Sequence, residues 1–149
     1  MRKWTALVVV LAVAVTVAGP AFTKEWLDKA VLTAAERVLS GMPADFYQIE
    51  PQAAQRLMET AKPLVLDVRE KAEWDTERIA GAVHVPIREL TKALDKLPDG
   101  RGAPIVVYCA VGVRGAMATV VLRMLGYTNV RNLRGGLAGW KAAKLPVVK

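Results

Sequence analysis

Two kinds of segment alternate along the chain from Phe46 onward, and this alternation restricts the fold more than any other feature. Short runs rich in β-branched residues are followed by longer stretches whose apolar residues recur at helical spacing. Such an order predicts an α/β domain with a central parallel sheet covered by helices. The expected strands are residues 47–49, 64–68, 82–85, 105–108 and 130–133, and the expected helices are residues 51–60, 71–74, 88–97, 115–125 and 137–143.

Residues 1–21 are expected to be a secretory signal peptide. Arg2 and Lys3 are followed by an uncharged run, residues 4–23, that is rich in valine and alanine, and small residues precede Phe22. An uncleaved membrane anchor is the alternative, because ~20 helical residues at about 1.5 Å each just span a hydrocarbon core of about 30 Å. Either way, we expect an exported protein, located in the periplasm or another extracytoplasmic space.

Residues 22–45 are expected to link this segment to the domain, which occupies residues 46–149. Apolar residues recur over residues 24–39 at the spacing of an amphipathic helix, and Ser40, Gly41 and Pro43 end the pattern. This helix is a candidate contact surface for the domain, for a partner protein or for a membrane. The sequence does not choose among these, and it does not give the oligomeric state.

The charge and the cysteine content exclude several classes of function. The formal net charge is +7, but basic residues are interspersed with acidic ones and aromatic residues are few, so no nucleic-acid-binding surface is predicted. We expect instead a basic surface that favours small anions. Cys109 is the single cysteine and His84 the single histidine, which allows neither an intramolecular disulfide nor a metal site built from these residues. No cofactor is predicted.

A short loop joins the C-terminal end of the expected central strand to the start of a helix, where open α/β sheets bind ligands. Gly112 can adopt the positive φ that turns successive amides toward a common centre. No proline interrupts the run, so every backbone N–H is available and an anion-binding cradle is predicted. The candidate binding residues are Ala110, Val111, Gly112, Val113, Arg114 and Gly115, which follow Cys109 directly.

Cys109 is expected at the rim of this cradle, where it would act as a nucleophile. The loop amides, the positive end of the helix and the guanidinium of Arg114 favour the thiolate over the thiol. Such a thiolate suits attack on the outer sulfur of thiosulfate or of a persulfide. Cys109 would then hold a persulfide until a thiol or cyanide removes the sulfur. Arg69, at the end of another expected strand, could add positive potential.

The loop resembles the active-site loop of the rhodanese family, in which a cysteine is followed by a glycine and an arginine at this spacing. Three further motifs, residues 67–70, 78–86 and 135–140, stand in the order that this family shows, so the resemblance covers about residues 46–145. It implies an α/β fold with a parallel sheet flanked by helices on both faces. It also implies that Cys109 is catalytic and that the loop amides and Arg114 bind the oxyanion.

Two positions depart from the family pattern. Many relatives have arginine where this chain has Ala110, and serine or threonine where it has Gly115. The mouth of the site is therefore less cationic and lacks a hydroxyl group. A small persulfide becomes as plausible a donor as thiosulfate.

Two other functions are open to such a loop. Protein phosphatases and arsenate reductases also place a cysteine and an arginine around an amide cradle, but their related loops have five residues between the two, whereas this loop has four. A non-catalytic module that carries sulfur or senses an anion is the other alternative. A cysteine protease is disfavoured, because His84 is the single candidate base.

The remaining motifs are interpreted as structural, with one exception. Asp67 and Arg69 are expected to pair with each other or with nearby loops, and His84 to form a hydrogen bond near the edge of the sheet. The glycines at positions 135 and 136 predict a tight turn, and Trp140 is expected in the core. The helix over residues 115–125 is expected to be buried, with apolar positions around most of its circumference, and Gly126 is expected to end it in a left-handed conformation. Arg114 is the exception, since we expect it to face the bound anion rather than to form a surface ion pair.

Overall fold

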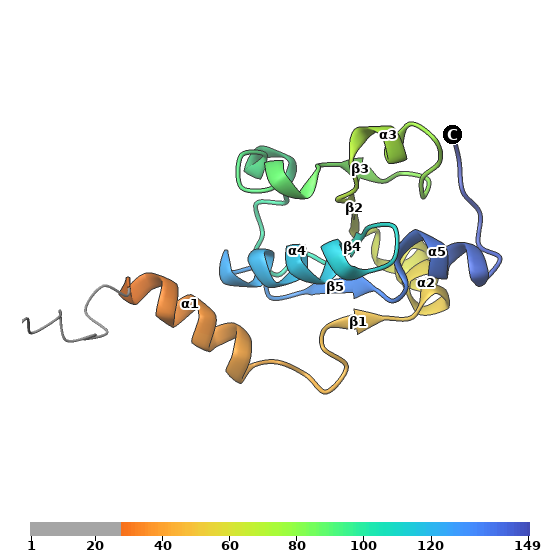
Figure 1. The fold of residues 1–149 in the computed structure, drawn as a ribbon. Helices are drawn as coiled ribbons and strands as arrows, with labels where there is room; N and C mark the ends of the chain where they lie inside the picture. Colours follow the sequence, from red (N-terminus) through yellow and green to blue (C-terminus); the bar gives the residue numbers. More distant parts are fainter. Residues whose placement is uncertain (1–27) are drawn as a thin grey trace, which may run out of the picture.

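Five parallel strands form one sheet in the order β1-β5-β4-β2-β3, which confirms the predicted fold class. The computed structural model describes residues 28–149 (Figure 1). The strands are β1 (Gln48–Ile49), β2 (Leu64–Asp67), β3 (Val83–His84), β4 (Ile105–Tyr108) and β5 (Val130–Leu133). The helices are α1 (Lys29–Ser40), α2 (Pro51–Ala61), α3 (Lys71–Trp74), α4 (Val113–Met124) and α5 (Gly136–Ala142), and two 3₁₀ helices are η2 (Ile87–Glu89) and η3 (Leu94–Lys96).

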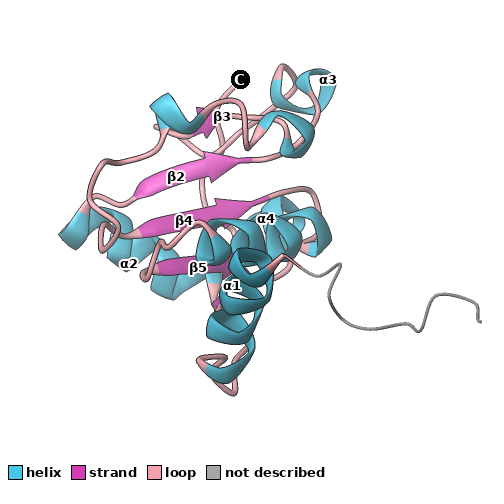
Figure 2. Ribbon diagram, turned by 90° about the vertical axis from the view of Figure 1, so that its left-hand side faces the viewer, coloured by secondary structure: helices cyan, strands magenta, loops and turns pink. Residues whose placement is uncertain are grey.

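Strand β4 occupies the centre of the sheet, between β2 and β5 (Figure 2). All four of its residues are buried, as its unbroken apolar sequence predicts for a strand covered on both faces. Because all strands run the same way, their C-terminal ends meet at one edge of the sheet. Cys109 follows β4 directly at this edge.

Helices cover the two faces of the sheet and give the domain two apolar cores. On one face, α4 contributes Ala118 and Leu122, which pack against Val107 of β4 and against residues from the segment after β3. On the other face, α2 and α5 lie together and pack against Val106 and other residues of the sheet (Figure 1). Trp140 of α5 is 2% exposed, so its predicted place in the core is confirmed.

Helix α4 ends as its sequence predicts. Gly126 has φ of +95°, which is a conformation that favours glycine, and its N–H donates to the carbonyl of Arg123 at 3.0 Å. The N–H of Tyr127 donates to the carbonyl of Leu122 at 3.1 Å, which completes a Schellman motif. The helix that follows the cysteine loop therefore has a fixed end, just before the buried Tyr127.

Three expectations about the helices are wrong. Residues 88–97 do not form one helix, because they fold into η2 and η3 with Ala93 in a non-helical conformation between them. Helix α4 begins at Val113 rather than at residue 115, so Arg114 belongs to its first turn. This helix is also less buried than expected, since Met117 and Val120 are 60% and 37% exposed.

Helix α1 packs against α4 outside the sheet (Figure 2). It begins at Lys29, later than expected, because Asp28 has an extended backbone and its carboxylate accepts the N–H of Ala30 at 2.7 Å. Its contact with the domain centres on Val38, whose carbonyl accepts the hydroxyl of Tyr47 at 3.0 Å. The predicted signal peptide and residues 24–27 lie outside the described residues. Within residues 28–149, no helix combines the length and the apolar character that a bilayer span needs.

Candidate active site

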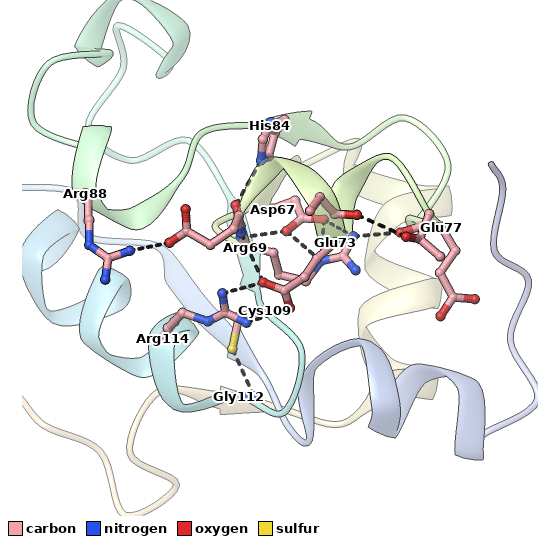
Figure 3. A network of polar contacts seen from close by, with 12 residues as sticks. Asp67, Arg69, Glu73, Glu77, His84, Arg88, Cys109, Gly112 and Arg114 are labelled. Carbon is pink, nitrogen blue, oxygen red and sulfur yellow. Dashed lines mark hydrogen bonds and ion pairs between the residues drawn. The ribbon is translucent and has the colours of Figure 1, made fainter.

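Cys109 lies at the floor of the predicted loop. The residue is 1% exposed and packs within the core on the α4 side of the sheet, so the expectation of a sulfur at the rim is wrong. The physical reason is that the burial of β4 on both faces continues one residue past its end. The N–H of Gly112 donates to Sγ of Cys109 at 3.1 Å, which places a backbone donor against the sulfur (Figure 3).

The loop closes through Gly112, as predicted. This residue has φ of +100° and is the N-cap of α4, so the chain turns back toward the sulfur. The side-chain amide of Asn132, on β5, donates to the carbonyl of Gly112 at 3.2 Å and holds the turn from below. Asn132 was not identified from the sequence, although a polar residue on the same face of the strand as apolar Val130 is a signal of such a contact.

A second turn supports the first from the side. The N–H groups of Leu137 and Ala138 donate to the carbonyls of Cys109 and Ala110 at 2.7 Å and 2.9 Å. Gly136 lies so close that a Cβ at this position would overlap the carbonyl oxygen of Cys109 and lie 2.8 Å from the nitrogen of Gly112. The two glycines predicted to form a tight turn therefore also allow this turn to touch the cysteine loop.

Arg114 forms an ion pair above the sulfur. Its Nη1 and Nη2 atoms donate to the two carboxylate oxygens of Glu73, at 2.6 Å and 2.8 Å, and both side chains are about one-third exposed. Sγ of Cys109 lies between this guanidinium and the N–H of Gly112 (Figure 3). The hydrogen bonds with Glu73 raise the pKa of Arg114, and the nearby sulfur of Cys109 acts in the same direction.

Glu73 was not identified from the sequence as part of the site. It lies on α3, which follows β2, and its carboxylate also accepts the backbone N–H of Glu70 at 3.2 Å within a capping box. The pKa of Glu73 is lowered, mainly because Arg114 donates to its carboxylate. The ion pair that the sequence disfavoured for Arg114 is thus present, and its partner Glu73 lies in the segment that connects β2 to β3.

Arg69 is buried beside the site and is paired. Its Nε and Nη2 atoms donate to the Asp67 carboxylate at distances from 2.6 Å to 3.0 Å, and Nη2 also donates to the carbonyl of Glu77 at 2.7 Å. Burial acts to lower the pKa of Arg69, but the hydrogen bond and the charge of Asp67 outweigh it, and the pKa is raised. The predicted pairing of the two residues is confirmed.

His84 has the structural role that its sequence context predicts. Its Nε2 atom lies 2.9 Å from the carbonyl oxygen of Arg69, and its ring stacks on Trp74 with 4.8 Å between the ring centres. The ring therefore fixes the segment after β2 to the edge strand β3. The described residues also include no group of three or more His, Cys, Asp or Glu side chains arranged to hold a metal ion.

Two open cavities flank the ion pair of Arg114 and Glu73. One, of about 510 Å³, includes Arg69, Glu73 and Val111 in its lining, and the other, of about 590 Å³, includes Arg88, Arg114 and Met117. Val111 and Met117 are 62% and 60% exposed, so the mouth of the site has an apolar rim. Molecules with an organic part can therefore approach the loop from either side.

Comparison with known proteins identifies the family. The profile of the family described as Rhodanese-like domain matches residues 50–143, which is more than half of the chain. The chain belongs to this family. Its cysteine loop is therefore the loop of a rhodanese-like domain, and the resemblance drawn from the four motifs is confirmed.

Individual relatives agree with this assignment. The chain is 35% identical over 95 residues to a protein of Allochromatium vinosum named sulfurtransferase, covering 64% of this chain and 87% of that protein. It is 36% identical over 101 residues to the uncharacterized protein slr1261 of Synechocystis, covering 68% of this chain but 55% of that protein. A crystal structure of a rhodanese-related protein from Thermoplasma volcanium superposes with a TM-score of 0.61 at 32% identity, covering 69% of this chain and 98% of that one. These similarities support sulfurtransferase activity at the level of the family.

Gly115, which departs from the rhodanese pattern, has a packing reason in this chain. It is buried in the first turn of α4, and a Cβ at this position would overlap Oδ1 of Asn132. The amide of the same Asn132 supports Gly112. A glycine at position 115 thus permits the asparagine that holds the rhodanese loop.

Proposed function

We propose that this protein is a sulfurtransferase that carries sulfane sulfur on Cys109 as a persulfide. The observation that carries the proposal is the position of the sulfur, between the N–H of Gly112 at 3.1 Å and the guanidinium of Arg114. Both groups stabilise negative charge on sulfur, and a thiolate is the nucleophilic form of cysteine. The family assignment supports the same activity.

The reaction needs two displacements at sulfur. In the first, the thiolate of Cys109 attacks the outer sulfur of a persulfide R–S–SH, a new S–S bond forms, the old S–S bond breaks, and R–S⁻ leaves with the bonding electrons. With thiosulfate as donor, the leaving group is sulfite. In the second, an acceptor thiolate attacks the outer sulfur of the Cys109 persulfide and restores the thiolate. Cyanide as acceptor gives thiocyanate.

The loop residues have separate roles in this proposal. The N–H of Gly112 donates to the attacking sulfur, and Arg114 lies where charge develops on the leaving group. The N–H groups of Ala110, Val111, Val113 and Gly115 are candidates to hold the outer sulfur or an oxyanion. Asn132 and Leu137 act through the backbone, because they fix the carbonyls of Gly112 and Cys109.

Intact mass spectrometry tests this proposal. The purified protein is incubated with thiosulfate or with a small persulfide, freed of donor and weighed. We expect a gain of one sulfur atom that cyanide reverses and that Cys109→Ala does not show. Wild-type protein that takes up no sulfur from either donor would refute the persulfide mechanism, whereas phosphate-ester hydrolysis dependent on Cys109 would point to a phosphatase.

A sulfur-delivery module is the second candidate, and the burial of Cys109 favours it. A sulfur that is 1% exposed reacts with free small molecules only when the groups above it move. A partner protein that displaces the ion pair of Arg114 and Glu73 would meet this need. Uptake of sulfur on Cys109 together with slow turnover of every small acceptor would select this function over a small-molecule sulfurtransferase.

We also propose that the protein is exported. The apolar run at residues 4–23 after Arg2 and Lys3 supports this location, and α1 would then lie between that segment and the domain. Mass spectrometry of the protein recovered from periplasmic and membrane fractions tests it. Loss of residues 1–21 from the periplasmic form supports a cleaved signal, and recovery of the whole chain in the cytoplasm refutes export.

A further inference from the structure

The cations around the cysteine loop are all held by carboxylates. Four basic side chains lie at or beside the two cavities, and each forms an ion pair with an acidic neighbour. The pairs are Arg69 with Asp67, Arg88 with Glu70, Arg114 with Glu73 and Lys141 with Glu77. Among the described residues that line these cavities, each positive charge therefore already has a carboxylate partner with which an incoming anion must compete.

Glu73 holds its place more firmly than an ordinary surface carboxylate. Its Oε2 atom accepts both the Glu70 backbone N–H, at 3.2 Å, and Nη1 of Arg114, at 2.6 Å, while Oε1 accepts Nη2 at 2.8 Å. Both terminal nitrogens of the guanidinium are engaged in the paired geometry that a sulfonate or carboxylate ligand would otherwise use. An anion that binds Arg114 must compete with this carboxylate and is repelled by its charge.

We infer that Glu73 is a specificity-determining residue that disfavours dianionic donors such as thiosulfate and favours organic persulfides. This inference rests on the proposed sulfurtransferase function. Glu73 acts through Arg114, so it is a positioning residue rather than a catalytic one. A neutral R–S–SH group presents its outer sulfur to Cys109 without needing a free guanidinium.

The cavities supply room for the organic part of such a donor. On one side, Val111, Leu137 and Ala138 offer apolar contacts, and on the other Ile87 and Met117 do so. Thiosulfate has no apolar part and gains nothing from these surfaces. The cations around the site are thus paired with carboxylates and bind a small dianion weakly, whereas the apolar side chains contact the carbon chain of an organic persulfide.

The test compares donors in wild type and in Glu73→Gln. The substitution keeps an oxygen that can accept the N–H of Glu70, but it removes the charge that holds Arg114. The readout is the rate of sulfur uptake on Cys109, measured by quenched intact mass over a range of donor concentrations. The donors are thiosulfate and the persulfide of 2-mercaptoethanol, which carries no charged group on its carbon chain.

We expect Glu73→Gln to raise the second-order rate constant for thiosulfate about tenfold, which is the lower end of what one hydrogen bond to a charged group contributes. The gain should lie in a lower half-saturating concentration rather than in a faster limiting rate. The rate constant for the persulfide should change by less than about threefold. The preference for thiosulfate over persulfide is therefore the quantity that changes.

Two further variants identify the cause. Asp75→Asn removes a negative charge two residues after Glu73. Asp75 forms an exposed ion pair with Lys71 and lines neither cavity. We expect it to leave the donor preference within about twofold of wild type, as for other exposed pairs. In Glu73→Gln with Arg114→Gln, the gain with thiosulfate should disappear, because the freed guanidinium is absent.

The pH profile of the wild type gives an independent reading. Protonation of Glu73 releases Arg114, so the preference for thiosulfate should rise as the pH falls through the pKa of Glu73 in the folded protein, which lies below the ordinary value of 4.5, and Glu73→Gln should lack the rise. The charged groups around Glu73 are Arg114 from α4, Arg69 after β2, and Glu77 and Lys141, which line the cavity of about 510 Å³ together with Glu73. The difference between the two profiles isolates Glu73 from these neighbours.

The outcomes separate this inference from the proposed function. Wild type that takes up no sulfur from either donor refutes the function itself. Uptake by wild type with an unchanged donor preference in folded Glu73→Gln overturns the inference about Glu73 alone. If Glu73→Gln does not fold, as judged by its circular dichroism spectrum, the wild-type pH profile decides, and a preference that stays flat as Glu73 is protonated in acid overturns the inference.

Discussion

Replacement of Gly136 by alanine tests whether the turn before α5 positions the cysteine loop. A Cβ at this position would overlap the carbonyl oxygen of Cys109 and lie 2.8 Å from the Ala110 carbonyl carbon and from the Gly112 nitrogen, where 3.4 Å is an ordinary contact. All three atoms belong to the backbone, so no side chain can rotate away. The loop must move by at least ~0.6 Å relative to the turn, which is a costly rearrangement of a packed site.

The expected loss of stability has two parts. Gly136 has φ of +56°, and alanine in this left-handed conformation costs about 1 kcal/mol. The overlap with the loop adds about 2 kcal/mol, as for other overpacked sites. We therefore expect the free energy of unfolding to fall by about 3 kcal/mol in Gly136→Ala.

Gly126→Ala is the matched control for this prediction. Gly126 also has a positive φ, of +95°, but a Cβ there would meet nothing within 4 Å. It should lose only the backbone part, about 1 kcal/mol, and take up sulfur at the wild-type rate. Urea denaturation followed by tryptophan fluorescence measures both variants.

Activity gives the second reading of the same pair of variants. Misplacement of a reacting group by less than ~1 Å can cost one to two orders of magnitude in rate, so we expect sulfur uptake on Cys109 to slow at least about tenfold in Gly136→Ala. Equal stability losses in the two variants, with unchanged sulfur uptake in both, would show that the turn does not hold the loop.

Two other expectations follow from the ion pairs. Asp67→Asn leaves the Arg69 guanidinium buried without its counter-charge, so the free energy of unfolding should fall by about 3 kcal/mol in urea titrations, against less than about 1 kcal/mol for the exposed Asp75→Asn. Similar losses in both would contradict a special role for burial. The lowered pKa of Glu73 means that its pair with Arg114 stabilises the folded state above pH 4.5 and is lost as the pH falls through the folded-state value. Wild type and Glu73→Gln should therefore differ in denaturation midpoint near neutrality and converge in acid, and a constant difference would refute the linkage.

The sheet could be predicted because its strands carry their own signal. The run Ile105, Val106, Val107, Tyr108 has no polar residue, which is typical of a strand covered on both faces, and the structure places it at the centre. The glycines at positions 126, 135 and 136 were equally informative, since positive φ is a local requirement that their sequence positions reveal. The central strand and the glycine turns depend on residues that are neighbours in the sequence, and they could therefore be predicted from it.

The prediction of one helix over residues 88–97 was wrong because tertiary packing overrides the helical spacing of the apolar residues there. Leu90, Leu94 and Leu97 predict one apolar face, but Leu90 and Leu97 are 1% and 6% exposed while Leu94 is 44% exposed. Two short 3₁₀ turns bury the outer pair of leucines in a way that one continuous helix does not. A periodic pattern alone does not show which of its members reach the core.

The loop residues of the candidate site could be predicted from the sequence, whereas Glu73 was not identified. Cys109, Gly112 and Arg114 belong to one loop, so their proximity follows from the chain itself. Glu73 is 41 positions from Arg114, and their contact depends on the order of β2 and β4 in the sheet. Adjacent parallel strands bring the segments that follow them to one edge, which is the signal that could have found Glu73.

The contact between the cysteine loop and the start of α5 has a consequence for how the protein acquires reactivity. Cys109 is synthesised well before residues 135–138, yet the carbonyls of Cys109 and Ala110 receive their hydrogen bonds from that later segment. A nascent or partly unfolded chain therefore has the thiol without the clamp that shapes its surroundings. The reactivity of this cysteine therefore depends on the complete tertiary structure. Cleavage of the chain between β5 and α5 would abolish the reactivity while leaving the cysteine unmodified.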